Sequence, residues 1–210
     1  MTRPLVFATR NAGKVTELRA LVPDGEVLTI AAAEARLGRA IPEVVEDGAT
    51  FAANAIKKAR AVAEATGWPA LADDSGLEVD ALGGAPGVYS ARYAGVDGPG
   101  HDQANCAKLL VELDGVPAPR TARFRSVVAL ADPHGPLGAE VVIADGVCDG
   151  EILTAARGDG GFGYDPLFFC PALGVTFAEA TVAAKNALSH RGRAMAELAP
   201  RLRAYLTSAG

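Results

Sequence analysis

The order of strand-like and helix-like segments constrains this fold most, because they alternate without a strict strand–helix–strand repeat. Short apolar runs at 4–9 and 27–30 predict two strands, and apolar spacing at 13–22 predicts a helix between them. Residues 121–131 and 140–147 predict a pair of long strands. This irregular order favours an α/β fold with a mixed β-sheet flanked by helices over a doubly wound parallel sheet.

The middle of the chain predicts a long helix at 50–66, followed by a short strand at 69–72. Asp73-Asp74-Ser75-Gly76 reads as a sharp turn at the end of that strand, with a separate strand at 77–80. Residues 83–100 are rich in glycine and predict a loop. Further helices are expected at 101–113 and after Ser189, with a glycine-rich turn between them at 158–163.

Length and charge narrow the classes of function. The 210 residues suit a single domain over 1–210. The net charge of −5 and the lack of a Lys/Arg block argue against a nucleic-acid polymer as partner. No apolar run is long enough for a membrane span and the N-terminus does not resemble a signal peptide, so we expect a cytoplasmic protein. The three cysteines have no zinc spacing and are expected to be free thiols.

The segment from Thr9 to Lys14 separates the first predicted strand from the first predicted helix. Such a position suits a phosphate, because backbone N–H groups and the helix dipole point at the anion and Lys14 adds a cation. The segment is not a P-loop, since Ala8 stands where glycine is needed and Val15 where Ser or Thr should hold magnesium. Taken alone, it is equally compatible with an ordinary polar turn.

Two acidic segments are candidates for a metal site. Adjacent carboxylates at Asp73 and Asp74 are costly unless a cation compensates them, and Mg²⁺ prefers such oxygen ligands. A carboxylate there could also orient or deprotonate a water molecule. A solvated acidic turn is the alternative. Glu43 or Glu46 could supply a second metal carboxylate, or these acids could complement the dipole of the following helix.

The segment Gly160–Pro166 places Phe162 between glycines, which suits stacking on a flat ring because the backbone can approach closely. Pro166 favours an extended Asp165, which aims its side chain. A tight turn would explain the same residues. Three later side chains could reach phosphates or donate to a base carbonyl, or be ordinary polar residues: Lys185, His190 and Arg191.

Four stretches together carry a family resemblance. They are FATRNAGKVTEL from residue 7, ADDSGLEVDALGGAPGVYSARYAG from residue 72, GGFGYDPLFF from residue 160 and LSHRGRA from residue 188. In order and spacing they resemble the inosine triphosphate pyrophosphatase family, also called Ham1-like or non-canonical purine NTP pyrophosphatases. The resemblance runs from about residue 5 to the C-terminus.

The resemblance implies an elongated α/β fold with a long mixed sheet, two lobes and a nucleotide cleft between them. It also implies a homodimer that uses Mg²⁺. The implied reaction is hydrolysis between the α- and β-phosphates of ITP, dITP and XTP, which gives the monophosphate and pyrophosphate. Such an enzyme removes these nucleotides from the pool before they are incorporated into DNA or RNA.

Carried over by position, the resemblance makes Asp74 the catalytic carboxylate and a metal ligand. Asp73 would assist, and Glu46 (or Glu43) would be the second metal ligand. Arg10 is a departure, because many members have glycine there, and it would add a cation near phosphate. The implied substrate-binding residues are Thr9, Arg10, Asn11, Ala12, Gly13, Lys14, Ser75, Phe162, Gly163, Tyr164, Asp165, Lys185, His190 and Arg191.

Three other functions remain open at this point. One is a related pyrophosphatase that acts on dUTP or modified pyrimidine nucleotides. Another is a regulator that binds purine triphosphates without hydrolysing them, although the acidic pair Asp73-Asp74 argues against it. The third is a docking protein that uses the glycine-rich loops as its surface, but that leaves Lys14, Lys185 and His190 unexplained.

Overall fold

The computed structural model describes residues 3–22 and 27–208. The domain expected over 1–210 therefore includes residues 1–2, 23–26 and 209–210, which lie outside the described residues. The described strands form one sheet in the order β2-β1-β3-β4-β5-β6-β7. They are β1 (Leu5–Phe7), β2 (Val27–Thr29), β3 (Ala70–Val79), β4 (Thr121–Ala131), β5 (Val141–Ile152), β6 (Phe168–Cys170) and β7 (Val175–Thr176).

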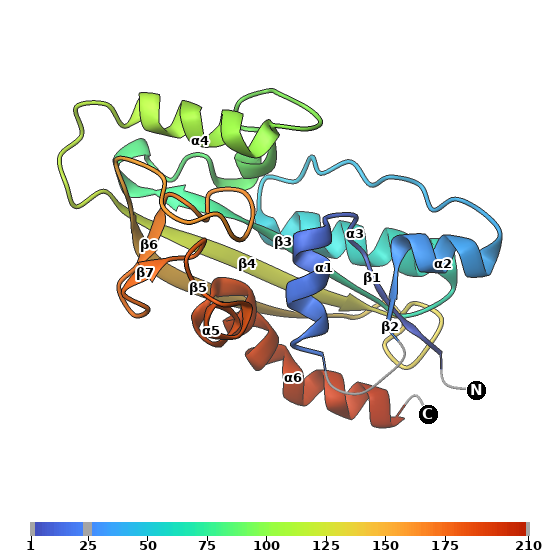
Figure 1. Ribbon diagram of the computed structural model, residues 1–210. Helices are drawn as coiled ribbons and strands as arrows, with labels where there is room; N and C mark the ends of the chain where they lie inside the picture. Colours follow the sequence, from blue (N-terminus) through green and yellow to red (C-terminus); the bar gives the residue numbers. More distant parts are fainter. Residues whose placement is uncertain (1–2, 23–26, 209–210) are drawn as a thin grey trace.

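The sheet is mixed, as predicted. Strand β1 runs parallel to both β2 and β3, whereas the pairs from β3 to β7 are antiparallel. The predicted pair of long strands is confirmed, because β4 pairs with β5 from Thr121 opposite Glu151 to Ala131 opposite Val141. These two strands and β3 form the longest part of the sheet (Figure 1).

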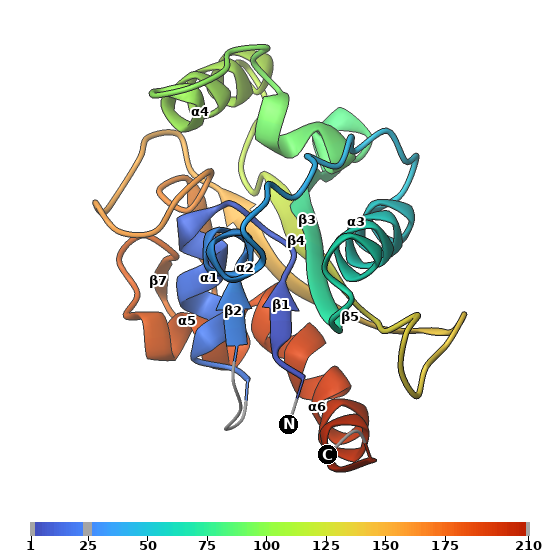
Figure 2. The same ribbon diagram turned by 90° about the vertical axis from the view of Figure 1, so that its right-hand side faces the viewer.

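Helices flank both faces of the sheet, with α3 on one side and α6 on the other (Figure 2). The predicted long helix is confirmed as α3, which Thr50 caps by accepting from the Ala53 amide and which ends at Gly67 with φ of 73°. The described helices are α1 (Ala12–Arg19), α2 (Ile30–Leu37), α3 (Phe51–Thr66), α4 (His101–Glu112), α5 (Val182–Leu188) and α6 (His190–Ser208).

Alternation along the central strands builds two cores. Val127 and Ala129 of β4 join the cluster beneath α3. Val128 and Leu130 point the other way and pack with Leu198 of α6. Successive side chains of a strand face opposite sides, so a strand buried on both faces is apolar at consecutive positions. The same strand therefore carries both layers of helices.

A third core lies at the other end of the same strands. Leu77 of β3 and Phe124 of β4 pack there with Leu109 of α4 and with Phe168 of β6. This end forms one lobe beneath α4, and the end that carries β1, β2 and α2 forms the other (Figure 1). The strands β3, β4 and β5 therefore connect the two lobes.

Two sequence predictions were wrong, and one helix was missed. The Asp73-Asp74-Ser75-Gly76 segment is not a turn but the middle of the continuous strand β3. Helix α2 was not predicted, and the expected loop at 83–100 contains a 3₁₀ helix at Gly87–Arg92. Turn-forming residues misled the first prediction, because tertiary contacts to both carboxylates override their local preference.

Within the described residues, no helix is both long and apolar enough to cross a membrane. The three cysteines are free thiols, as expected. Cys148 and Cys170 lie buried on neighbouring strands with their sulfurs 3.8 Å apart, and burial raises the pKa of Cys148 to about 12. The Cys148 thiol is therefore protonated at neutral pH, and both cysteines pack as part of the core.

Replacing Leu198 with alanine tests the core between α6 and the sheet. The side chain is fully buried, so the lost contacts and the cavity are expected to cost about 2–5 kcal/mol of unfolding free energy, measured with urea. Val111→Ala on α4 is the control, because Val111 is 75% exposed and its truncation should cost less than about 0.5 kcal/mol. Equal losses in the two variants would contradict this account of the core.

Candidate active site

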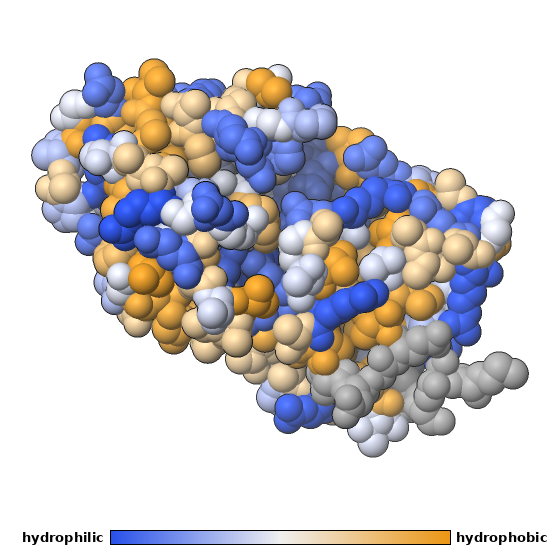
Figure 3. Space-filling view, viewed as in Figure 1, coloured by the Kyte–Doolittle hydropathy of each residue, from blue (hydrophilic) through white to orange (hydrophobic). Residues whose placement is uncertain are grey.

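A cleft of about 290 Å³ lies between the two lobes. Figure 3 shows the surface hollowed between the region of α4 and the region of α2. The cleft lining contains most of the predicted site residues: Thr9, Arg10, Asn11, Lys14, Glu43, Glu46, Asp74, Ser75, Phe162, Gly163, Tyr164, Asp165, Lys185, His190 and Arg191. Ala12 and Gly13 lie beside it in the first turn of α1 and are not part of the lining.

Strand β3 separates the two adjacent carboxylates. Because neighbouring side chains of a strand face opposite sides, Asp73 faces Arg191 at the start of α6, and Asp74 faces Asn54 and Lys58 of α3. A turn would have held both acids at one point, as the sequence suggested. The strand instead gives each carboxylate its own set of partners.

Asp73 is fully buried and joins two cations. One of its oxygens lies 2.7 Å from Lys14 Nζ and 3.1 Å from an Arg191 nitrogen, and the other accepts from Ser126 at 2.5 Å. Burial alone would raise the pKa of Asp73, but Arg191, Lys14 and these hydrogen bonds hold it well below its usual range. Asp73 is therefore ionised, and the pair of cations stays in place.

Asp74 lies in a different environment. Its carboxylate accepts from Asn54 at 3.1 Å and from Lys58 at 3.1 Å, and Lys58 also donates to Glu46 at 2.9 Å. Burial raises the pKa of Asp74 and the nearby Glu46 raises it further, whereas Lys58 opposes the shift. Burial would also raise the pKa of Glu46, but Lys58 outweighs it and lowers that pKa. Asp74 therefore has the raised pKa and Glu46 the lowered one, which makes Asp74 the better candidate for a base.

The wall formed by α1, α5 and α6 holds a second buried ion-pair network. Glu17 lies 2.7 Å from Lys185 Nζ and also pairs with Arg191. Lys185 reaches Asp165 at 2.5 Å as well. Burial would lower the pKa of Arg191, but Asp73 and Glu17 raise it. Both cations therefore face the cleft from fixed positions.

The segment before α1 has the form expected of a phosphate-binding turn. Asn11 caps the helix by accepting from the Lys14 amide at 3.0 Å, and its own amide donates to Thr9 at 3.2 Å. Arg10 borders the cleft, but its guanidinium donates to Glu34 at 2.7 Å and to the Ile41 carbonyl at 3.0 Å. Arg10 thus ties the turn to the chain segment that leads to Glu46.

The glycine-rich loop places Phe162 against the turn that precedes α1. A Cβ at Gly13 would overlap the Phe162 ring, so the close approach requires glycine there. Lys185 Nζ lies 5.0 Å from the ring centroid and the Arg191 guanidinium 5.9 Å from it. Phe162 is half-buried between the two lobes, where its ring borders the cleft. The turn and the loop, far apart in sequence, therefore meet at this ring.

His190 is buried and stacks on Phe124, with ring centroids 4.8 Å apart. Burial lowers the pKa of His190 well below its ordinary value, and Arg191 adds to the shift. The imidazole is therefore neutral at pH 7. Its Nδ1 is among the buried polar atoms of the described chain that have no hydrogen-bond partner. His190 can thus offer a ring nitrogen to a ligand without carrying charge.

Glu46 and Asp74 are the carboxylates that can share a metal ion at the cleft. Both approach the same Lys58 ammonium, so their oxygens lie close together, and two such ligands with substrate phosphates suit Mg²⁺. Glu43 is exposed at the rim of the cleft, which favours Glu46. In the part of the chain that is described, no group of three or more His, Cys, Asp or Glu side chains could hold a metal.

Sequence reasoning missed three residues of the site, namely Glu17, Asn54 and Lys58. Glu17 follows Lys14 by three residues, so the helical spacing of α1 already placed them on one face. Asn54 and Lys58 are four residues apart in α3 and share a face in the same way. Polar residues on the buried face of an amphipathic helix were the available signal.

Replacing Asp73 with asparagine tests the ion-pair network. Two buried cations lose their shared anion, so the unfolding free energy at pH 7 is expected to fall by about 3–5 kcal/mol in urea titrations. The folded pKa of Asp73 is depressed, so its contribution is lost as pH falls through that value, and the two proteins converge in acid. Asp145→Asn, at an exposed ion pair, is the control. Equal stability of D73N and the wild type would refute this role.

Comparison with known proteins places this geometry in a family. The sequence pattern of the Ham1 family matches residues 5–201. The dITP/XTP pyrophosphatase of Desulforamulus reducens is 55% identical to this chain, and the match covers 91% of each protein. The dITP/XTP pyrophosphatase of Geobacter sulfurreducens is 54% identical, and the match covers 94% of this chain and 95% of the relative.

Solved structures agree with the sequence relatives. A HAM1 protein from Coxiella burnetii is 40% identical, with a TM-score of 0.81 over 96% of this chain and 98% of its own. A nucleoside-triphosphatase, or dITP/XTP pyrophosphatase, from Mycobacterium abscessus is 42% identical, with a TM-score of 0.69 over 94% of this chain and 99% of its own. The chain belongs to the Ham1 family.

Proposed function

We propose that this chain is a Mg²⁺-dependent pyrophosphohydrolase that converts ITP, dITP and XTP to the monophosphate and pyrophosphate. The observation that carries the proposal is a single cleft that has cationic side chains on one wall and carboxylates on the other. Lys14, Lys185 and Arg191 supply cations on one side, and Asp74 and Glu46 supply oxygen ligands on the other. The names of the relatives support the substrate class. The activity removes these nucleotides before they enter DNA or RNA.

Asp74 and Glu46 would hold the metal, which supplies positive charge to the phosphate oxygens when bound. Lys58 already holds both carboxylates at one point with contacts of 3.1 and 2.9 Å, so little reorganisation is needed. Asn54 fixes the other oxygen of Asp74. The two ligands are thus oriented before any nucleotide binds.

Asp74 is the group that would accept the proton of the attacking water. Its pKa is raised by burial, so it is a stronger base than an ordinary aspartate. As water adds to phosphorus, the bridging P–O bond between the α- and β-phosphates breaks and pyrophosphate leaves with the electron pair. No covalent intermediate with the protein is needed.

The triphosphate would lie across Thr9, Asn11, Ala12, Gly13 and Lys14, close to Ser75. Its negative charge would meet the side chains of Lys14 and Lys185. Asp73 and Glu17 hold these cations at fixed positions, so the site is preorganised for an anion. Arg10 would contribute mainly by anchoring the turn, because its side chain is engaged with Glu34.

The purine would stack on Phe162, with Gly163, Tyr164 and Asp165 shaping the pocket. Neutral His190 and charged Arg191 would donate hydrogen bonds to the 6-oxo group. Adenine carries an amino group at that position, so a donor would meet a donor. An unpaired buried polar group costs about 1–3 kcal/mol, which disfavours ATP.

The proposal also includes a homodimer and a cytoplasmic location. The dimer is an expectation from the family resemblance, and light scattering after size exclusion tests it. The location follows from the proposed substrates, because the nucleotide pool that supplies DNA and RNA synthesis is where such an enzyme acts. Fractionation of the source cells tests the location.

The experiment that tests the function is pyrophosphate release from ITP, XTP, dUTP, GTP and ATP, with Mg²⁺ and with EDTA. Rapid, metal-dependent conversion of ITP and XTP to monophosphates, with ATP and GTP nearly untouched, is expected. Release of orthophosphate would indicate a phosphatase instead. A preference for dUTP would indicate the pyrimidine enzyme, and tight binding of ITP without turnover would indicate a regulator.

Asp74→Asn is expected to lower kcat for ITP by about 10²–10⁴-fold, because the variant loses a base and a metal-facing charge. Asp47→Asn is the control, since Asp47 is exposed on the same segment as Glu46 and pairs with Lys57. The kcat is measured at saturating ITP, and circular dichroism checks the fold. A folded D74N enzyme with the wild-type kcat would rule out this role.

The pH dependence of kcat/KM is expected to be bell-shaped. Activity rises as Asp74 loses its proton, at a pH above the aspartate value of about 3.9, because burial raises its pKa. Activity falls as Lys14 loses its proton, below the lysine value of about 10.4, because burial lowers that pKa. The ionisation of ITP itself is titrated separately and subtracted. An alkaline limb at or above the ordinary lysine value would contradict the role of Lys14.

A further inference from the structure

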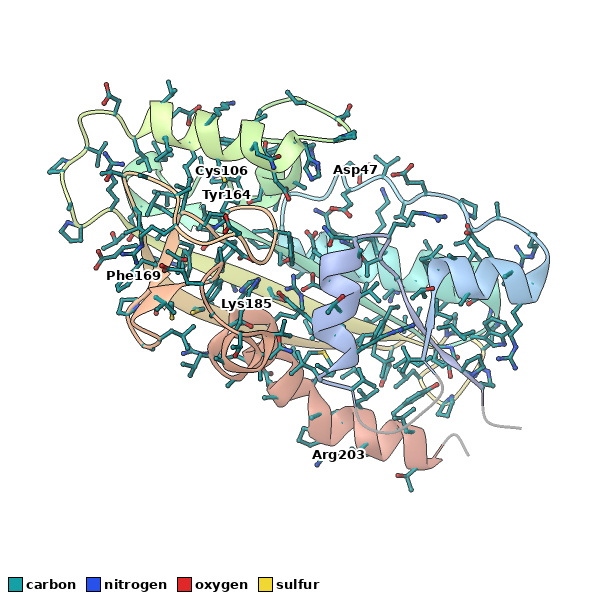
Figure 4. The ribbon with its side chains drawn as sticks, in the orientation of Figure 1. Asp47, Cys106, Tyr164, Phe169, Lys185 and Arg203 are labelled. Atoms are coloured by element: carbon teal, nitrogen blue, oxygen red, sulfur yellow. The ribbon has the colours of Figure 1, made fainter. Side chains whose placement is uncertain are left out.

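Side chains from the first two turns of α4 form hydrogen bonds with the backbone of the glycine-rich loop. The Gly163 amide donates to Asp102 at 2.8 Å, and the Cys106 thiol donates to the Gly163 carbonyl at 3.4 Å. Figure 4 shows Cys106 of α4 close to the loop that carries Tyr164. Both polar groups of one peptide residue are thus bound by side chains of the same helix.

Gly163 is the residue next to Phe162 and has φ of 60°, a conformation that favours glycine. On the other side, the Phe162 amide donates to Asp165 at 2.9 Å. The Tyr164 hydroxyl donates to the Ser90 carbonyl at 2.9 Å. The backbone that carries Phe162 is therefore held on both sides, and the contacts from Asp102 and Cys106 are the ones that cross from α4.

Asp102 does not cap its own helix. The N-cap of α4 is Gly100, and no side-chain capping bond forms there. The carboxylate instead pairs with His101 at 3.0 Å and accepts from Gly163, and it forms part of the cleft lining. An acid that only complemented the helix dipole would not need this contact with a loop some 60 positions away.

Cys106 supplies a second hydrogen bond between α4 and Gly163. Burial raises the pKa of Cys106 to about 11, and the nearby Asp102 adds to the shift. The group is therefore a thiol at neutral pH and donates its S–H to the Gly163 carbonyl. Because a carboxylate acceptor makes the stronger hydrogen bond, Asp102 contributes more to holding Gly163 in place than the Cys106 thiol does.

We propose that Asp102 is a positioning residue that holds Phe162 in its stacking orientation through the Gly163 amide. The inference rests on the proposed function, because it assumes that Phe162 stacks on the purine. It goes further in assigning the geometry of the base pocket to α4, which contributes no group to the phosphate side of the cleft. Loss of Asp102 then weakens recognition of the base and leaves the triphosphate site intact.

The test compares Asp102→Ala, which removes the acceptor, with Asp102→Asn, which keeps a neutral acceptor of the same shape. Asp114→Ala is the matched control, because Asp114 is an exposed acid just after the end of α4. Each variant is assayed for kcat and KM with ITP and for inhibition by inorganic pyrophosphate. Hydrogen exchange of the peptide that covers 160–165 is measured on the free proteins. The KM of Phe162→Ala for ITP shows how large the effect is when stacking is lost completely.

For D102A we expect KM for ITP to rise about tenfold, as for loss of a hydrogen bond to a charged group. The kcat and the inhibition by pyrophosphate stay near the wild-type values, and exchange at 160–165 accelerates. D102N recovers most of the KM and the protection, and D114A matches the wild type. A D102A variant with unchanged KM overturns the inference, as does a parallel loss of pyrophosphate inhibition, which would indicate general damage to the cleft.

The two proposals fail in different ways. A wild-type protein that does not hydrolyse ITP refutes the proposed function. Unchanged exchange at 160–165 in D102A refutes the positioning role, whatever the activity, because it reports the loop in the free protein.

Discussion

The site depends on one buried carboxylate, Asp73, which is ionised in the interior because Lys14 and Arg191 both pair with it. Without this anion, two cations would lie close together in a poorly solvated cleft, where their repulsion and desolvation would be costly. With it, α1 and α6 are joined across β3, and a positive wall exists before any phosphate arrives. Glu17 extends the same arrangement to Lys185.

Strand β3 turns this ion pair into a site with two chemically different sides. Its alternation directs Asp73 to the cations and Asp74 to Lys58 and Glu46. The opposite pKa shifts of the adjacent acids follow from these environments, since Asp73 has two cations beside it while Asp74 is buried next to another carboxylate. Two consecutive residues thereby provide an ion-pairing anion of lowered pKa and a carboxylate of raised pKa. The long strands run through both lobes and so connect the two sides.

Much of the fold followed from local patterns. The helix at Phe51–Thr66 and the paired long strands were predicted because periodicity, capping and length agree there. Most of the candidate site residues do line one cleft. The prediction of a turn at Asp73-Asp74 was wrong, since Asp, Ser and Gly favour turns unless distant residues compensate the carboxylates. Helix α2 was missed because it begins at Ile30, directly after β2, and Ile30 had been assigned to the predicted strand at 27–30.

The sequence by itself determined the class of fold, the segments that carry chemistry and the types of charge in each. Only the tertiary structure decided which charges are partners, because Lys58 and Glu17 lie on helices whose buried faces look like ordinary packing surfaces until the sheet is placed beneath them. It also decided that adjacent carboxylates face opposite sides and that α4 holds Gly163. Such facts depend on contacts between residues distant in sequence, and local preferences carry no record of them.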